Sequence, residues 1–463
     1  MSEYDVVVIG SGIGGSAVGA LLAFNGLKTL LVEKNEIIGG RCSTYEKEGF
    51  KIDVGVHSFG RTGKGPLGRV LGMIGMEDAV EWVLARKPGP LQYSNGEWCR
   101  LPKDFEKLMP ASEFRSFMKL FSDALQIQNT SELDGISVKS WMSNYTNDTL
   151  ARSFINAICF LYFVIPYTEA SAGEFVRCLA SLTRDLSTGY PKGGCVAIPQ
   201  AYVQGIQKFG GDLRKGVSVK KIVVEDEKVQ GVELEDGEFV SSRIVVSNAG
   251  IRETVNNLVG RSHFEEDYLV KIDRLKYSMS ALTLKLALEK PITNIKMANS
   301  ISMADPDEQY RLMLEGKVPE EIDLFTPVPS NYDTSLAPKG RQLIIAGIAV
   351  PRENFEKNKE KWISNSMRRL EEMFPNLSSN LMWYDVSPPS DIGRLGGKEE
   401  SVIGVAQTTD QVGDKRPSPV LPVEGLYVVG GDAGGWGIGT ELAATSAIEL
   451  SEIILKKTRN VTT

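Results

Sequence analysis

A glycine-rich turn between a buried strand and a helix constrains this chain more than any other feature. Residues 4–9 (YDVVVI) are an unbroken, mainly β-branched run, which is typical of a parallel strand covered on both faces. Residues 12–26 predict a helix whose small side chains let it lie close to a sheet, and residues 28–33 predict a second strand. The turn contributes four glycines: Gly10, Gly12, Gly14 and Gly15. This order predicts a β-α-β unit that binds a dinucleotide.

Each part of the motif has a mechanical reason. Gly10 permits the tight turn, Gly12 lets the backbone approach a pyrophosphate, and Gly15 lets the helix pack closely on the strand. Glu33 ends the second strand, where a carboxylate accepts hydrogen bonds from ribose hydroxyls and disfavours a 2′-phosphate. The N-terminus of the helix then faces the phosphates.

Composition excludes several classes of protein. The net charge of −7 and the lack of a basic stripe argue against a nucleic-acid partner. The five cysteines are scattered and contain no C-x-x-C pair, so we expect neither a disulfide framework nor a thiolate metal site, and we assign no metal. The chain passes from Met1 directly into a strand pattern without signal-peptide features, which predicts a cytoplasmic location.

The 463 residues exceed what one hydrophobic core usually organises, so we expect two domains. Strand and glycine-turn patterns assign residues 1–70, 186–254 and 396–463 to the nucleotide-binding domain. Residues 71–185 have helical periods without strand punctuation and predict a helical cap. Residues 255–395 combine strand patterns with an amphipathic helix and complete the second domain. The two domains are therefore interleaved along the chain.

Segments downstream of the glycine turn carry a resemblance to known proteins. They are Gly39-Gly40-Arg41, Asp53 to His57 (DVGVH), Tyr190 to Gly194 (YPKGG), Val219 and Ile222, Ser247-Asn248-Ala249, and Gly425 to Gly439 (GLYVVGGDAGGWGIG). Their order resembles the superfamily of FAD-dependent amine oxidases and phytoene desaturases, most closely its phytoene desaturase-like branch. The resemblance covers most of the nucleotide-binding domain and only the outline of the second domain.

The resemblance implies FAD as the cofactor and gives several residues a role. Arg41 would contact phosphate, because a guanidinium fork matches phosphate geometry. The main chain of Val219 would contact the adenine, and Asp432 would hydrogen-bond the ribityl or pyrophosphate region. The helix that begins near Gly439 would direct its positive end at the flavin N1/O2 locus. The predicted cofactor-binding residues are Gly10, Gly12, Gly14, Gly15, Glu33, Lys34, Gly40, Arg41, Val219, Asn248, Gly430, Asp432 and Gly439.

Catalytic side chains are harder to predict, since the cofactor itself carries the chemistry of hydride transfer. His57, which the resemblance places near the isoalloxazine ring, is either a proton relay, because its ordinary pKa is near neutral, or a hydrogen-bonded packing residue. Cys42 is expected to be a buried, unreactive thiol, and His263 to be exposed. The apolar run 154–166 is shorter than the roughly 20 residues of a membrane span. It packs in a core, lines a lipid-sized tunnel or touches a membrane face.

The expected fold class is α/β, with a Rossmann-type FAD-binding domain interleaved with a mixed α+β substrate domain that carries a helical cap. The expected function is that of an FAD-dependent oxidoreductase transferring hydride between flavin N5 and a C–C bond of an apolar, isoprenoid-like or alicyclic substrate, as a desaturase or a saturase. The alternatives are an FAD-dependent amine or protoporphyrinogen-type oxidase, and a non-catalytic prenyl-binding carrier resembling the Rab GDP dissociation inhibitors. Glu33 and Asp432 argue against the carrier. Gly431 and Thr445-Ser446-Ala447 depart from the family pattern and leave open a substrate other than a carotenoid.

Overall fold

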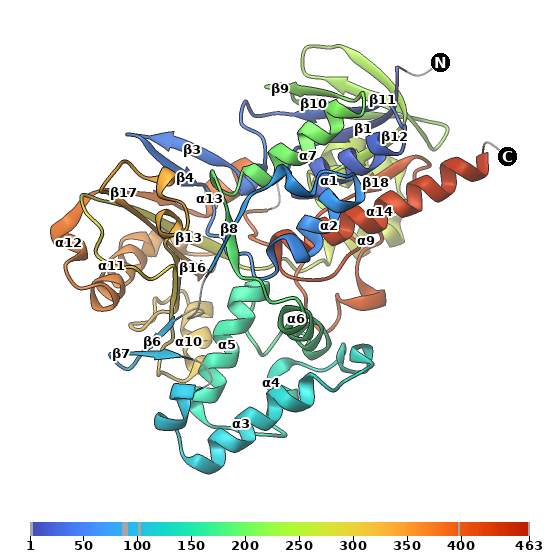
Figure 1. The fold of residues 1–463 in the computed structure, drawn as a ribbon. Helices are drawn as coiled ribbons and strands as arrows, with labels where there is room; N and C mark the ends of the chain where they lie inside the picture. The colour runs from blue at the N-terminus through green and yellow to red at the C-terminus, as the bar shows by residue number, and fades with distance from the viewer. Residues whose placement is uncertain (1–2, 86–90, 101–102, 397–398, 462–463) are drawn as a thin grey trace.

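The structure is a computed structural model that describes residues 3–85, 91–100, 103–396 and 399–461 (Figure 1). Two seven-stranded sheets dominate it, and a group of helices lies beside the second sheet, at the bottom of the view. Both ends of the chain lie at the outer side of the first sheet. This arrangement confirms the expected α/β fold with a second, mixed unit.

The first sheet joins a parallel core to an antiparallel meander. Its strands are, in spatial order, β10 (Val219–Glu225), β11 (Lys228–Leu234), β12 (Phe239–Ser247), β1 (Tyr4–Ile9), β2 (Thr29–Glu33) and β9 (Asp212–Lys215), with β18 (Leu426–Val428) also paired to β12. The long strand β12 pairs with β11 as far as Ser241 and with β1 from Ser242 onward, and β18 lies beside its last residues. Strands β1, β2, β9, β12 and β18 run parallel, so their carboxyl ends meet at one edge.

Helices cover this sheet and explain the unbroken apolar strands. One face packs against α1 (Ile13–Phe24), α2 (Pro66–Met73), α7 (Ala197–Lys208) and α14 (Gly439–Val461). The other face packs against the meander and α9 (Glu266–Asp273). Every residue of β2 and all but one residue of β1 are buried, as a strand covered on both sides requires. The predicted β-α-β unit is confirmed.

The second sheet is mostly antiparallel. Its strands are, in spatial order, β17 (Leu381–Ser387), β13 (Ser280–Leu288), β16 (Gln342–Val350), β15 (Leu324–Pro327), β14 (Met297–Ser300), β6 (Leu91–Ser94) and β7 (Glu97–Arg100). Helices connect these strands along the chain: α10 (Pro306–Leu314), α11 (Phe355–Met373) and α12 (Leu377–Asn380). Helix α13 (Pro389–Gly396) follows β17. Two small ladders, β3 (Thr44–Lys47) with β4 (Phe50–Asp53) and β5 (Trp82–Leu84) with β8 (Gly189–Pro191), lie between the sheets along the chain.

The prediction that residues 71–185 are purely helical is wrong. This segment contains β5, β6 and β7, and the β6–β7 hairpin extends the second sheet. Asn95 and Gly96 form its turn, both with positive φ (50° and 79°), which is the signal of a two-residue hairpin. The remainder of the segment is helical as expected: α3 (Ala111–Ala124), α4 (Val138–Met142), α5 (Thr149–Phe163) and α6 (Ala172–Arg184).

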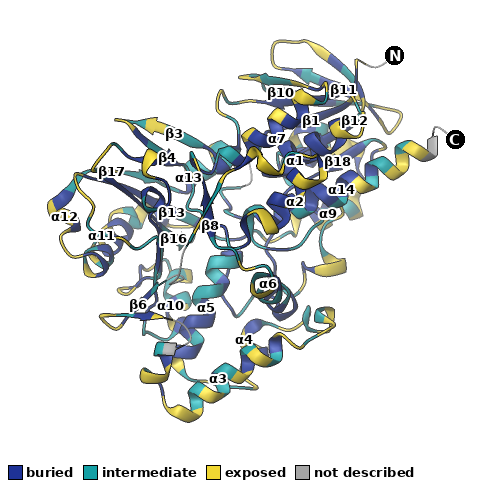
Figure 2. Ribbon diagram, viewed as in Figure 1, coloured by how far each residue is buried: buried dark blue, intermediate teal, exposed yellow. Residues whose placement is uncertain are grey.

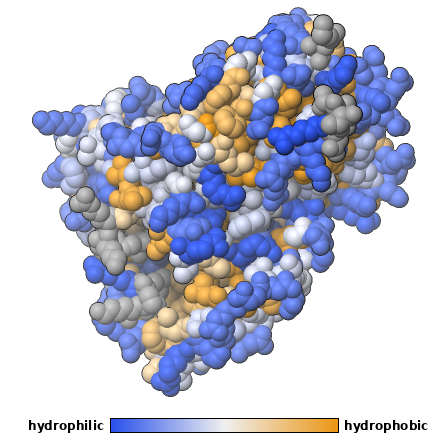
Figure 3. Space-filling view, turned by 45° about the vertical axis from the view of Figure 1, so that its right-hand side comes forward, coloured by the Kyte–Doolittle hydropathy of each residue, from blue (hydrophilic) through white to orange (hydrophobic). Residues whose placement is uncertain are grey.

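Burial follows these layers (Figure 2). Buried residues concentrate in the two sheets and the helices that cover them, whereas the outer face of α3 and the hairpin tips are exposed. On the face shown in Figure 3, hydrophilic residues surround small apolar patches. None of the helices in the described residues is long and apolar enough to cross a bilayer.

Candidate functional site

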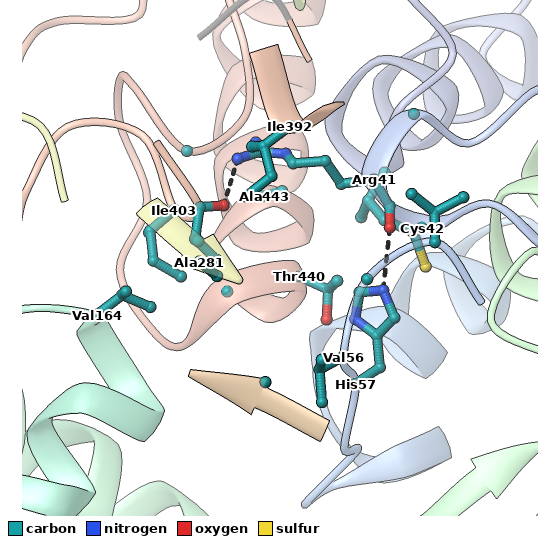
Figure 4. Close-up of a pocket in the computed structure, with 18 of the residues that line it drawn as sticks. Arg41, Cys42, Val56, His57, Val164, Ala281, Ile392, Ile403, Thr440 and Ala443 are labelled. Carbon is teal, nitrogen blue, oxygen red and sulfur yellow. Dashed lines mark hydrogen bonds between the residues drawn. The ribbon is translucent and has the colours of Figure 1, made fainter. Parts of the chain in front are cut away.

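A cavity of about 790 Å³ opens where β1, β2 and β12 end. Its walls come from the loops after these strands, the segment 54–58, helix α5, the second sheet and the first turn of α14. Figure 4 shows its centre, with Arg41 and His57 on one side and Val164 and Ala281 on the other. All residues predicted for the site line this cavity except Gly15 and Asp432.

The glycine turn leaves no room for side chains. Gly10 has a φ of +91°, a conformation that L side chains rarely adopt. A Cβ at Gly12 would lie 2.7 Å from Nδ2 of Asn248, and a Cβ at Gly14 would lie 2.9 Å from Cα of Gly430. No side chain caps the first turn of α1, so its backbone N–H groups are left for an anion. The ends of β1, β12 and β18 therefore form a cradle that fits a pyrophosphate.

Glu33 lines the cavity, but its carboxylate is engaged by its own chain. Oε2 accepts from N and Oγ of Ser11 at 2.8 and 2.6 Å, and Oε1 accepts from N and Nδ2 of Asn35, both at 2.9 Å. A carboxylate offers about four lone-pair sites. The predicted contact with ribose hydroxyls requires either Ser11 Oγ or the Asn35 amide to turn away.

Arg41 follows the glycine pair Gly39-Gly40 and reaches across the cavity. Its Nη1 donates to the carbonyl of Ser401 at 2.6 Å and to the carbonyl of Val402. Burial lowers the pKa of the Arg41 guanidinium, and the Asp432 carboxylate opposes that shift. The structure thus holds a desolvated cation at the cavity wall; its contact with phosphate stays a prediction.

His57 lies on the same wall. Its Nε2 is 3.0 Å from the carbonyl oxygen of Arg41 (Figure 4). Its ring stacks on Phe59 at a centroid distance of 6.0 Å. Burial disfavours the imidazolium, but Cys195, Asp53 and the Arg41 carbonyl outweigh it and raise the pKa of His57 to about 9. The raised pKa favours the imidazolium form of His57, which faces the cavity.

Two cysteines that lie far apart in the sequence meet beside this histidine. The sulfur atoms of Cys42 and Cys195 and a ring nitrogen of His57 lie within 4.8 Å of one another. The spacing of the cysteines in the sequence could not reveal this cluster. Cys42 donates to the carbonyl of Cys195 at 3.3 Å, and Cys195 donates to the carbonyl of Ser43 at 3.5 Å. Burial raises the pKa of Cys195 well above its usual range. A soft metal ion needs thiolates, so binding here would have to displace these protons.

The C-terminal motif supplies the last part of the wall. Gly430, Gly439 and Thr440 line the cavity, and α14 begins at Gly439. Asp432 instead is fully buried, and its carboxylate accepts from the backbone N–H groups of Ile251 and Val405 at 2.9 and 3.2 Å. Both carboxylate oxygens thus serve the loops behind the motif and Asp432 does not line the cavity, so its predicted hydrogen bond with the cofactor stays a prediction.

The opposite wall escaped sequence analysis. Thr283 on β13 and Ser387 at the end of β17 are paired neighbours that line the cavity. Behind them Nζ of the buried Lys285 donates to Ser387 Oγ and lies 5.5 Å from the ring centre of Tyr45. Burial lowers the pKa of Lys285 to about 8, although Asp391, Asp385 and Asp53 favour its charged form. Val219 lies at the other rim of the cavity beside Ser218 and the exposed Glu235.

Helix α5 forms the apolar roof over the second sheet. Its contribution to the cavity comes from Phe154, Ala157, Ile158, Phe160, Leu161 and Tyr162. The run 154–166 therefore lines the cavity while also packing in the core of the helical group. Cys42 is buried and His263 is exposed, as predicted.

Comparison with known proteins agrees with this geometry. The family profile described as flavin containing amine oxidoreductase matches residues 16–455. The zeta-carotene-forming phytoene desaturase of Myxococcus xanthus is 25% identical, over 92% of this chain and 89% of that protein. The chloroplastic prolycopene isomerase of Daucus carota is 26% identical, over 92% of this chain and 76% of that protein.

A solved structure has the same fold. An oxidoreductase from Methanosarcina mazei superposes with a TM-score of 0.78 at 22% identity, over 96% of this chain and 99% of that chain. The family match spans most of the sequence and includes the elements that line the cavity, apart from β1 and the glycine turn that follows it. The chain therefore belongs to the flavin containing amine oxidoreductases, in a phytoene desaturase-like branch, and is a flavin-dependent oxidoreductase.

Proposed function

We propose that this protein binds FAD and transfers a hydride between flavin N5 and a C–C bond of an apolar substrate, as a desaturase or a saturase. The observation that carries the proposal is the continuity of the cavity. The cradle for a pyrophosphate and the space between α5 and the second sheet belong to one continuous cavity. A cofactor in the cradle and an apolar molecule in that space would therefore meet. Relatives named phytoene desaturase and prolycopene isomerase support an isoprenoid-like substrate.

The residues present fit FAD. Gly10, Gly12 and Gly14 leave backbone next to the pyrophosphate, and Glu33 lies at the ribose side. Arg41 would supply a desolvated positive charge to a bound phosphate. The space beside His57 and Thr440, in the first turn of α14, would receive the isoalloxazine.

A bound FAD would supply a two-electron acceptor or donor at N5. The chain supplies position and charge. The His57 imidazolium and the positive end of α14 favour negative charge on a reduced flavin. Phe160, Leu161 and Ile348 exclude water from the substrate space.

Moving a hydride between carbon and flavin leaves a proton to be handled by the chain. His57 is a poor acceptor at neutral pH because its pKa is raised to about 9. Lys285, with a pKa lowered to about 8, is closer to neutrality and reaches the cavity through Ser387. Lys285 is therefore the better relay, and His57 the better electrostatic group.

The apolar mouth of the cavity suggests how the substrate reaches it. Leu182 and Leu186 line the cavity, and Leu186 is 65% exposed. Leu84, on the neighbouring ladder, is 51% exposed, and the N–H of Ala85 donates to the carbonyl of Thr188 at 2.7 Å. This pair of leucines would let a cytoplasmic protein touch a membrane surface while it takes up a lipid-like molecule.

The experiment that tests the function is anaerobic reduction of the purified protein. We expect flavin absorbance that is released on denaturation as FAD, and bleaching by one or more apolar polyenes or alicyclic compounds but not by amines. Bleaching by amines alone would favour an amine oxidase. A colourless protein that FAD cannot reconstitute would favour a carrier.

A further inference from the structure

One row of paired residues runs across the second sheet and forms the floor of the cavity. Cross-strand pairing places its members side by side, and each lines the cavity: Gln92, Asn299, Phe325, Gly347, Thr283 and Ser387. A Cβ at Gly347 would lie 2.7 Å from Cγ2 of Val56, so the segment that carries His57 crosses the row at Gly347. Because His57 lies beside the proposed flavin position, the end of the row with Gly347, Thr283 and Ser387 is the end nearer the flavin.

The opposite end of the row lies well away from the flavin. Three strand spacings of about 4.8 Å separate Gly347 from Gln92, which gives about 14 Å. Phe325 occupies the floor between them, and Ile301 and Phe160 add apolar surface. A substrate that reacts near Gly347 and extends along the row would place its far end at Gln92 and Asn299.

That far end is polar and incompletely satisfied. Oδ1 of Asn299 is buried without a hydrogen-bond partner, and the amide of Gln92, 7% exposed, lies beside it on the paired strand β6. Asp323, the residue before β15, also lines the cavity; its Oδ1 accepts from the N–H of Ser302 at 2.7 Å. A buried acceptor left without a donor is costly, so Asn299 Oδ1 calls for a donor at this end of the cavity.

We propose that Gln92, Asn299 and Asp323 bind a hydroxyl group at the end of an otherwise apolar substrate. This inference rests on the proposed function and names the substrate class more narrowly: an apolar molecule with one remote alcohol. A hydroxyl donates to Asn299 Oδ1 or Asp323 and accepts from the amide of Gln92, so it matches both kinds of partner.

The surroundings favour a hydroxyl over an ammonium group. The guanidinium of Arg369 lies over the ring of Tyr93, next to Gln92 in the chain, at 5.0 Å from its centre. Burial raises the pKa of Asp323 to about 6, and the positive charge of Arg369 opposes this shift. A second cation would be repelled by Arg369 and would meet neutral amides on two sides.

The test compares ligands that differ only at one end. Equilibrium dialysis of the flavin-loaded protein against farnesol, its methyl ether and farnesylamine measures three dissociation constants. We expect farnesol to bind about tenfold more tightly than the ether, as the gain of one donated hydrogen bond predicts. Equal binding of alcohol and ether, or tighter binding of the amine, would overturn the proposal.

Variants locate the effect. Asn299→Leu should bring the alcohol-to-ether ratio close to one, and Gln92→Leu should reduce it independently if the first variant folds poorly. Thr326→Val is the matched control, because Thr326 Oγ1 is also buried without a partner but lies on the opposite face of β15 from Phe325. A ratio unchanged in both leucine variants would count against the site. Flavin content of the same preparation reports separately on the proposed function, since it does not depend on which of the three ligands is dialysed.

Discussion

Arg61 and Glu441 form an ion pair that is almost fully buried between two walls of the cavity. Nε and Nη2 of Arg61 donate to one carboxylate oxygen of Glu441 at 2.8 and 2.6 Å, and the residues are 4% and 7% exposed. Nη1 of Arg61 lies 3.5 Å from Asp185. The pair ties the loop after His57 to the first turn of α14, so it fixes two segments that line the cavity.

Breaking this pair should be costly. Glu441→Ala removes the main partner of a buried guanidinium, and we expect a loss of about 3–5 kcal/mol in the free energy of unfolding, measured by urea denaturation. The double variant Arg61→Met with Glu441→Met removes both charges and should lose much less than Glu441→Ala. Burial raises the pKa of Glu441, in keeping with the cost of holding this charge. A double variant whose loss of stability equals the summed losses of Arg61→Met and Glu441→Met would contradict this account.

Gly15 is needed for packing rather than for direct contact with the cavity. A Cβ there would lie 2.0 Å from the carbonyl oxygen of Gly10, and backbone cannot yield as a side chain can. Gly15→Ala should displace α1 from β1, lower the melting temperature and reduce flavin retention. Gly19→Ala on the same helix is the control, because its Cβ would meet the flexible end of Ile206 at 2.8 Å. Equal effects of the two variants would show that the helix, not the turn, is sensitive.

The nucleotide side of the site could be predicted from the sequence because its signals are local. Gly10 to Glu33 form one continuous unit whose conformation follows from steric limits on a turn. The β6–β7 hairpin also had a local signal, Asn95-Gly96, which the helical periods around it concealed. Local patterns fail where a residue's partners come from distant segments, as for Asp432, whose carboxylate meets backbone from residues 251 and 405.

The substrate side had no such signal. Strand pairing across nearly 300 residues of sequence brings Gln92, Asn299 and Ser387 into one row. In its own segment each of them is an ordinary polar residue. The meeting of Cys42 with Cys195 is of the same kind. The boundaries drawn between the two interleaved domains stay a prediction.

The charge on His57 should tune the flavin. Because its pKa is raised to about 9, His57→Gln removes a positive charge at neutral pH. We expect the two-electron midpoint potential at pH 7 to fall by about 30 mV or more, since about 1.4 kcal/mol corresponds to 30 mV for such a couple. The exposed His263, as His263→Gln, is the control and should leave the potential unchanged. An unaltered potential in His57→Gln would leave His57 as a packing residue.

Lys285 should make stability depend on pH in a defined window. Its pKa is lowered to about 8 in the folded protein, mainly by burial, against about 10.5 in an unfolded chain. Below pH 8 the lysine is charged in both states and the folded state bears the cost of burying it; above pH 10.5 it is neutral in both. The free energy of unfolding should therefore rise with pH between these values, by up to about 3 kcal/mol.

Lys285→Met isolates this contribution. The carboxylate of Asp385 keeps Lys47, at 2.5 Å, and the hydroxyl of Tyr45, at 3.1 Å, so the variant leaves no buried charge alone. We expect the variant to exceed the wild-type protein in stability near pH 7 and to lose that advantage as the pH rises from 8 to 10.5, in urea titrations at fixed ionic strength. Lys47→Met removes a lysine from the same carboxylate at a more exposed position and should not change the slope. A stability difference between Lys285→Met and wild type that stays constant across the window would mean that Lys285 is charged throughout, and would remove it as a proton relay.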